Sequence, residues 1–196
     1  MEDTWLRPLV WTDYRLAVLF TVIAPIILLA WAFVKRAEAI ERLLIIYWRV
    51  ASLLAIAVYL MIFAWPFSFW VSIGARILIP VSLWFWADIN EEIREQPRSA
   101  LKLVLTAWRW AATIYCGLGA LFTIPFLSCA FDGAIATPAC QVWLEAPRLY
   151  KQFVHPHSST GFLGFLGFVG LIVYALYFGY FVVVRLGKQG RSALEQ

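Results

Sequence analysis

Apolar residues run along this chain in five long stretches that short polar segments separate. The stretches cover residues 16–34, 43–65, 67–87, 103–127 and 161–184. Each is close to the ~20 residues that a helix needs to cross the apolar part of a bilayer. The pattern therefore predicts an all-α integral membrane protein. We expect a bundle of five transmembrane helices in a single transmembrane domain, 1–196, with an external loop at 128–160.

Two proline-containing segments mark where helices end. Pro66 follows Trp65, and proline disfavours helical backbone in the residue before it. That turn carries no charge, so we expect the second and third spans to form a hairpin with a very short connection. Gln96-Pro97-Arg98-Ser99 is a plausible break and restart between the third and fourth spans.

Composition supports a membrane protein. Hydrophobic residues make up 63% of the chain and charged residues only 14%, against about 45–50% and 25% in soluble domains. The net charge of +4 is read as a topology signal and not as a nucleic-acid footprint. The expected partners are the lipid bilayer and other membrane proteins, with no nucleic acid.

The distribution of Lys and Arg predicts the orientation, because basic residues concentrate in cytoplasmic loops. One face carries nine: Lys35, Arg36, Arg42, Arg94, Arg98, Lys102, Arg185, Lys188 and Arg191. The other face carries four: Arg7, Arg15, Arg148 and Lys151. We therefore expect the N-terminus outside and the C-terminus in the cytoplasm. A four-span alternative with residues 71–87 re-entrant would put basic loops on both faces.

Arg76 is the main candidate for chemistry, because it lies in the middle of the third span and a charge there is costly. Pro80 cannot donate to the carbonyl of Arg76, which leaves that carbonyl free. No Asp or Glu lies deep in another predicted span, so no internal counter-ion is evident. The expected partners are backbone carbonyls, Ser72 one turn earlier, a lipid phosphate, a bound anion or another subunit. Both a structural role and a ligand-binding role stay open.

Two further arginines follow tryptophans, in the pairs Trp48-Arg49 and Trp108-Arg109. Each pair lies within two turns of the predicted inner edge. Long basic side chains can extend to the interface from such positions. The same residues could form an inner-leaflet site for a lipid headgroup or a partner.

Cysteine and histidine suggest a structured external segment. Cys129 and Cys140 both fall on the predicted outer face, where a disulfide is a reasonable hypothesis. Cys116, inside the fourth span, is expected to be a small buried apolar residue. His155 and His157 lie in the same external loop, so the spans contain no histidine to ligate haem. No metal site and no cofactor are predicted.

The fifth span opens with four glycines at a spacing of three: Gly161, Gly164, Gly167 and Gly170. Small residues let helix backbones approach closely in a membrane. Packing inside the protein is favoured over contact with a partner.

Several segments resemble an uncharacterised family of small cyanobacterial membrane proteins that carries a "domain of unknown function" label. They are Trp11–Phe20, Leu44–Ser52, Arg76–Pro80, Asn90–Glu92, Gln96–Ser99, Trp108–Trp110 and Arg185–Ser192. The resemblance implies an inner (cytoplasmic) or thylakoid membrane. It implies no activity and no catalytic residues.

No phosphate loop, zinc-protease motif or nucleophile elbow is present in the sequence. The chain is therefore expected to be no enzyme, but a non-enzymatic accessory or assembly factor that binds other subunits in a photosynthetic membrane. One alternative is a small anion or metabolite transporter organised around Arg76. Another is a lipid- or quinone-handling protein that uses Arg49, Arg76 and Arg109.

Overall fold

The computed structural model describes residues 3–131, 133–186 and 192, and every regular element in them is helical. The first rod joins α1 (Asp3–Ala17), η1 (Val18–Ile23) and α2 (Ala24–Lys35). The elements that follow are α3 (Glu38–Ile62), α4 (Ser68–Trp84), α5 (Ala87–Glu95), α6 (Ala100–Thr123), η2 (Ile124–Ala130), η3 (Ala134–Ala136), α7 (Pro138–Val154), α8 (Thr160–Tyr180) and η4 (Phe181–Arg185). The predicted tail residues Lys188 and Arg191 lie outside the described residues.

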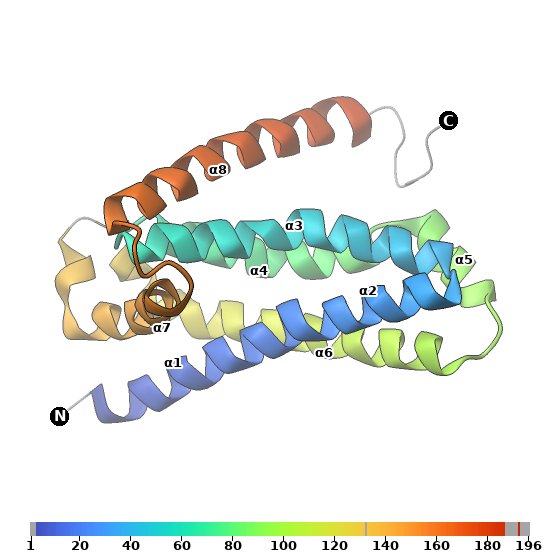
Figure 1. Cartoon of the computed structure of the whole chain (residues 1–196), viewed down its shortest axis with the longest axis horizontal. Helices are drawn as coiled ribbons and strands as arrows, with labels where there is room; N and C mark the ends of the chain where they lie inside the picture. The colour runs from blue at the N-terminus through green and yellow to red at the C-terminus, as the bar shows by residue number, and fades with distance from the viewer. Residues whose placement is uncertain (1–2, 132, 187–191, 193–196) are drawn as a thin grey trace.

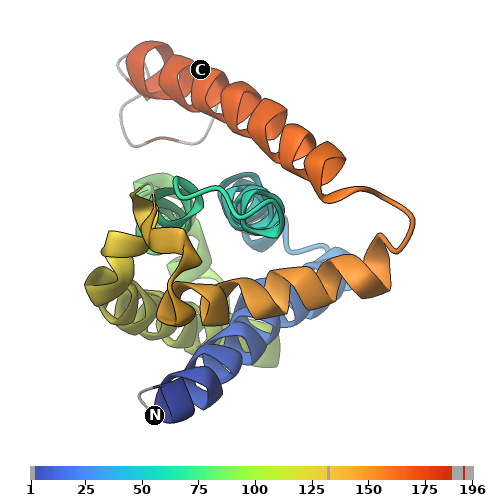
Figure 2. The ribbon, with the colours of Figure 1, turned by 90° about the vertical axis from the view of Figure 1, so that its left-hand side faces the viewer.

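The helical membrane bundle is confirmed. Four helical stretches among the described residues are long and apolar enough to cross a membrane: Trp5–Lys35, Glu38–Ile62, Ala100–Ala130 and Thr160–Arg185. The bent pair of α4 and α5 makes a fifth if it is one span. These elements run alternately in opposite directions, so that α1 begins and η4 ends at opposite ends of the bundle (Figure 1). Helix α7 lies across the bundle near the end where α1 begins (Figures 1 and 2).

The first rod starts much earlier than residue 16, the predicted start of the first span. Helix α1 begins at Asp3, and its side chains at Leu6 and Val10 are almost fully buried. Both belong to an apolar cluster with Phe69 and Trp143. The segment that the sequence placed outside the first span is thus part of the bundle, because α7 and η2 cover it.

At Pro25 and Pro147, side chains from other helices donate to the carbonyl that the proline leaves without its backbone donor. Pro25 has no N–H, and the preceding turn η1 is a π-helix. Its carbonyls at Thr21 and Phe20 accept from the Tyr47 hydroxyl at 2.7 Å and the Trp108 indole at 2.8 Å. A polar backbone group in the apolar part of a membrane needs such an internal partner. The aromatic donors therefore join the first rod to α3 and α6.

Pro147 in α7 repeats this arrangement. The carbonyl four residues earlier belongs to Trp143, and it accepts from the Tyr14 hydroxyl of α1 at 2.8 Å. A proline in one helix and a tyrosine in another thus form one complementary contact. This contact helps to hold α7 against the first rod.

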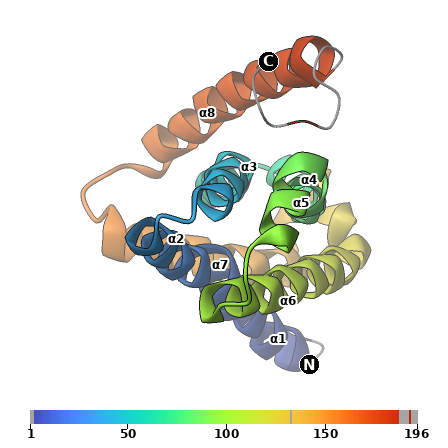
Figure 3. The same cartoon turned by 90° about the vertical axis from the view of Figure 1, so that its right-hand side faces the viewer.

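Connections agree in part with the sequence. The turn at Trp65-Pro66 joins α3 to α4, and the Ser99 side chain caps α6 by accepting from the Lys102 N–H at 3.2 Å. The third span is shorter than 67–87, because α4 ends at Trp84 and the chain bends by 53° into α5. Figure 3 shows α5 at the end of the bundle away from α7.

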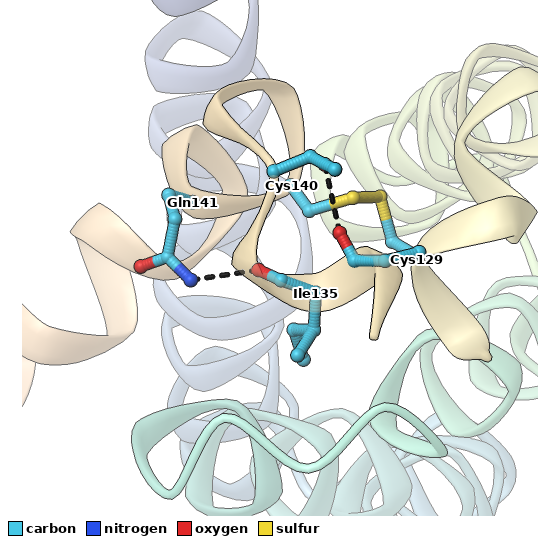
Figure 4. Close-up of a disulfide and its surroundings, with 6 residues drawn as sticks. Cys129, Ile135, Cys140 and Gln141 are labelled. Atoms are coloured by element: carbon cyan, nitrogen blue, oxygen red, sulfur yellow. Dashed lines mark hydrogen bonds between the residues drawn. A yellow bond between two sulfur atoms is a disulfide. The ribbon is translucent and has the colours of Figure 1, made fainter. Parts of the chain in front are cut away.

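The predicted external loop 128–160 is mostly helical. It contains the end of η2, the short η3 and the 17-residue α7. Cys129 and Cys140 are joined by a disulfide with a Cα–Cα distance of 5.6 Å (Figure 4). The bond holds η2 against the first turn of α7, and Gln141 donates to the Ile135 carbonyl of η3 at 2.7 Å.

Candidate functional site

Arg76 forms a bidentate ion pair with Asp13. It projects from the middle of α4 to α1, where its Nη1 donates to Asp13 Oδ1 at 3.0 Å and its Nη2 donates to Asp13 Oδ2. The two side chains are only 6% and 9% exposed. Two parallel hydrogen bonds of this kind are among the strongest that side chains make. The intramembrane cation therefore has a counter-ion inside the same chain.

Tyr115 of α6 completes the contact. Its hydroxyl lies 3.0 Å from both the Oδ1 atom and the backbone carbonyl of Asp13, and it donates to this pair of acceptors. Its ring centroid is 5.4 Å from the guanidinium carbon of Arg76. Three helices, α1, α4 and α6, thus meet at one buried cluster.

Gly119 provides the space for the guanidinium. A Cβ atom on Gly119 would lie 1.6 Å from Nη1 of Arg76 and 3.4 Å from Oδ1 of Asp13. No side chain fits there while Arg76 keeps its position. We call Arg76, Asp13, Tyr115 and Gly119 the Arg76 cluster.

The expectation for Arg76 was wrong about its partner. Both Nη atoms donate to Asp13, and not to Ser72 or to the carbonyls near Pro80. The sequence does not point to Asp13, because this residue precedes the apolar stretch 16–34 that predicts the first span. One signal could have found it: Leu6, Val10 and Asp13 follow the helical spacing of a single buried face.

The cluster can stabilise the bundle, but it offers little free charge to a ligand. Asp13 neutralises Arg76, so an incoming anion would compete with a buried carboxylate. Nε of Arg76 is buried and has no hydrogen-bond partner. Breaking a buried pair leaves one uncompensated charge, at a cost of about 3–5 kcal/mol. The arrangement is that of a structural contact between three helices.

Arg109 does not extend to the interface as the sequence suggested. It is 5% exposed, and its Nη2 donates to the Leu83 carbonyl at 2.5 Å and to Asn90 Oδ1 at 2.6 Å. Its guanidinium lies 4.0 Å from the ring centroid of Trp84. The bend between α4 and α5 frees carbonyls at the end of α4. Arg109 donates to that of Leu83, and Asn90 Nδ2 donates to that of Trp84 at 3.2 Å. The role of Arg109 is to stabilise this bend.

The other residues of the predicted inner-leaflet site differ in exposure and in contacts. Trp108 is buried, and its indole donates to the Phe20 carbonyl in the first rod, so it is not a headgroup contact. Trp48 is half-buried and packs edge-on against Tyr47. Arg49 alone among the four is exposed, and its Nη1 donates to the Tyr177 hydroxyl of α8 at 3.3 Å.

Three of the four glycines in the first half of α8 pack against other parts of the protein. A Cβ on Gly164 would lie 2.5 Å from the Cβ of Phe63, and one on Gly167 would lie 3.1 Å from the Leu60 backbone nitrogen. Gly170 has ordinary contact distance to Ile56, and Gly161 has open space around it. These glycines let α8 lie close to α3.

His155, which follows α7, has a structural contact, since its Nε2 lies 2.7 Å from the Tyr59 hydroxyl of α3. Cys116 is buried and not part of a disulfide. Within the part of the chain that the structure describes, no three His, Cys, Asp or Glu side chains are arranged to share a metal ion.

Comparison with known proteins places the chain in a family. A family model described as "Protein of unknown function (DUF3177)" matches residues 7–194. Neither the curated proteins nor the solved structures include one similar enough to match this chain. The matched range includes Asp13, Arg76, Tyr115 and Gly119, together with both disulfide cysteines. The resemblance to an uncharacterised family is confirmed, and the chain belongs to the DUF3177 family of proteins of unknown function.

Proposed function

We propose that this protein is a non-enzymatic accessory or assembly factor that binds other membrane proteins, and that the membrane is a photosynthetic one. Helix α8 carries the proposal. Only 6% of an 18-residue apolar stretch in Thr160–Arg185 is buried within the protein, against 39% for α3. Such a helix has most of its surface available to neighbours in the bilayer.

The body of the bundle supports this proposal over a transporter. The Arg76 cluster joins α1, α4 and α6 through a neutralised ion pair. Arg109 similarly donates to the Leu83 carbonyl and the Asn90 side chain at the α4–α5 bend. A transport site organised around Arg76 would need a free cation that can exchange partners, and the pair with Asp13 disfavours that.

Co-purification in mild detergent tests the proposal. The outer face of α8 is changed by Phe165→Ala with Leu176→Ala, two residues that are 61% and 70% exposed. The matched control is Leu118→Ala with Leu121→Ala on α6, where the exposed fractions are 63% and 64%. We expect a stoichiometric partner, identified by mass spectrometry as a subunit of a photosynthetic complex, to be lost with the α8 pair and retained with the α6 pair.

A lone oligomer without stoichiometric partners would contradict the accessory role. So would a partner whose yield falls equally with both pairs of substitutions. In either case the anion or metabolite carrier would become the better hypothesis, and a transport assay in vesicles would be the next measurement.

The orientation is a separate proposal, with the α5 end of the bundle in the cytoplasm. The sequence assigns nine Lys and Arg residues to this side of the membrane and four to the other. Basic residues concentrate in cytoplasmic loops, which supports the proposal. A cysteine at Ser99 should react with a membrane-impermeant thiol reagent only after the membrane is opened. A cysteine at His157 should react in intact cells. Labelling of the Ser99→Cys variant from outside would reverse the assignment.

A further inference from the structure

A groove lies between α3, α4 and the carboxyl half of α8. In Figure 1, α8 slants away from α3 toward its carboxyl end. The close contacts at Gly164 and Gly167 belong to the other half of α8. The groove has a volume of about 220 Å³. Its walls are mainly apolar and include Val50, Leu78, Val81, Phe178, Phe181 and Val182.

The polar groups that line the groove include several hydrogen-bond donors. Arg49, Tyr177 and Arg185 line it, and the first two are in contact at 3.3 Å. None of the described residues that line it is Asp or Glu. An anionic oxygen therefore finds complementary charge at Arg49.

Trp86 gives an independent indication of a ligand. It lines the groove, is 8% exposed, and its indole Nε1 has no hydrogen-bond partner. Buried indole N–H groups usually have an acceptor. Trp84 and Trp108, two of the other tryptophans, donate to the Thr113 hydroxyl and the Phe20 carbonyl. An oxygen of a bound molecule would supply the acceptor that Trp86 lacks.

We propose that this groove binds one anionic phospholipid. The phosphate and ester oxygens would lie at Arg49 and Tyr177, with an acyl chain along the apolar walls. An apolar transmembrane helix could contact these walls but would bring no anionic oxygen to Arg49, because its backbone carbonyls are bonded within the helix. A small soluble anion would leave the apolar walls uncovered. The groove also lies toward the bundle end with most of the basic loops, where anionic lipids of a cytoplasmic leaflet concentrate.

Lipid titration of the purified full-length chain, followed by native mass spectrometry, tests this proposal. The probes are dioleoyl phosphatidylglycerol and dioleoyl phosphatidylcholine, which differ in headgroup charge and share their acyl chains. We expect one tightly bound phosphatidylglycerol, preferred over phosphatidylcholine by about fivefold, given the attraction of Arg49. Equal binding of the two lipids by the unmodified protein would overturn the proposal without the need for any variant.

Matched variants locate the site. Arg49→Gln should lower phosphatidylglycerol affinity about fivefold and leave phosphatidylcholine binding unchanged. Arg98→Gln is the control, since this residue belongs to the same end and does not line the groove. An equal loss with the control variant would mean that charge at this end acts at a distance, and would overturn the site.

Two further variants test the apolar walls and the polar groups of the groove separately. Val81→Trp should fill the groove and weaken both lipids, because Val81 lines it and is 49% exposed. Trp86→Phe keeps the ring and removes the N–H, so it should weaken phosphatidylglycerol by a smaller factor. Unchanged binding of both lipids to the Val81→Trp variant would show that they bind elsewhere. The proposal does not depend on the accessory role, and its failure would leave that role intact.

Discussion

Arg76 in α4 and Gly167 in α8 both lie in an apolar helix, and they attach their helices to the bundle in opposite ways. Arg76 reaches two other helices through a buried ion pair and the neighbouring Tyr115 hydroxyl. Gly167 only allows the backbones of α8 and α3 to come close. In a bilayer no hydrophobic force drives helices together, so packing of small residues is a modest contribution. The bundle body should therefore be rigid, and α8 should be separable from it.

Removing Arg76 is expected to have the largest effect. Arg76→Leu leaves the Asp13 carboxylate buried without a counter-ion, which should cost about 3–5 kcal/mol of stability. Thermal unfolding in detergent measures this effect. Partner and lipid binding should be unchanged in the protein that stays folded, since neither proposed site includes Arg76.

A double variant sharpens the result. Arg76→Leu with Asp13→Leu removes both charges and should recover much of the lost stability, because a buried pair can often be replaced by apolar residues at little cost. If the double variant is as unstable as the sum of the single variants, the ion pair is not the cause of the loss.

The disulfide is the next largest contribution. Cys129→Ala with Cys140→Ala opens a loop that spans 11 residues of sequence separation, and should cost about 2–3 kcal/mol in the loop-entropy model. Cys116→Ala is the control, because Cys116 is buried and not in a disulfide. Mass spectrometry without reductant should show Cys129 and Cys140 linked. Two free thiols in protein from an oxidising compartment would contradict the bond.

Gly119→Ala should be the strongest of the glycine substitutions. Its Cβ would overlap Nη1 of Arg76, so the guanidinium must move away from Asp13. Overpacking of this kind costs about 1–3 kcal/mol. Gly117→Ala on the same helix is the matched control, since no neighbour lies within 4 Å of its Cβ position. Equal melting temperatures for the two variants would show that the space at Gly119 is not needed.

Substitution in α8 should have the smallest effect on stability. Gly167→Ala brings a Cβ to 3.0 Å from that of Tyr59, and should cost about 1 kcal/mol because the neighbours must shift slightly. Spin-label distances between α3 and α8 should lengthen, with the unfolding of the bundle body nearly unchanged. Gly161→Ala, which has open space, should change neither. A loss of the whole fold with Gly167→Ala would remove the contrast between α8 and the body.

Much of the fold follows from local features of the chain. The apolar stretches predict the helices, and Pro66, Pro97 and Ser99 mark where they end or begin. The glycine spacing of α8 favours close packing, and Gly164, Gly167 and Gly170 lie near residues 56–63. The start of α1 and the bend after Trp84 were not predicted, since both depend on residues from α6 and α7 that lie far away in sequence.

The site was only half predictable. Arg76 was identified by its depth in an apolar stretch, which is a local property of the sequence. Its partner was not, because Asp13 lies 63 residues away and precedes the apolar part of its helix. Arg109 shows the same limit: its position within two turns of the predicted inner edge suggests a side chain that extends to the interface, whereas the bend after α4 requires it inside.

The sequence by itself determined that this chain forms apolar helices and where most of them end. It also determined which few cations are costly to leave without partners. These properties depend on the length and polarity of contiguous segments. Only the tertiary structure decided that Asp13 neutralises Arg76, that Tyr47 and Trp108 satisfy the carbonyls near Pro25, and that α8 diverges to leave a groove. Such pairings depend on how the helices pack against one another, and the cost of an unsatisfied polar group in an apolar environment selects among the possible partners.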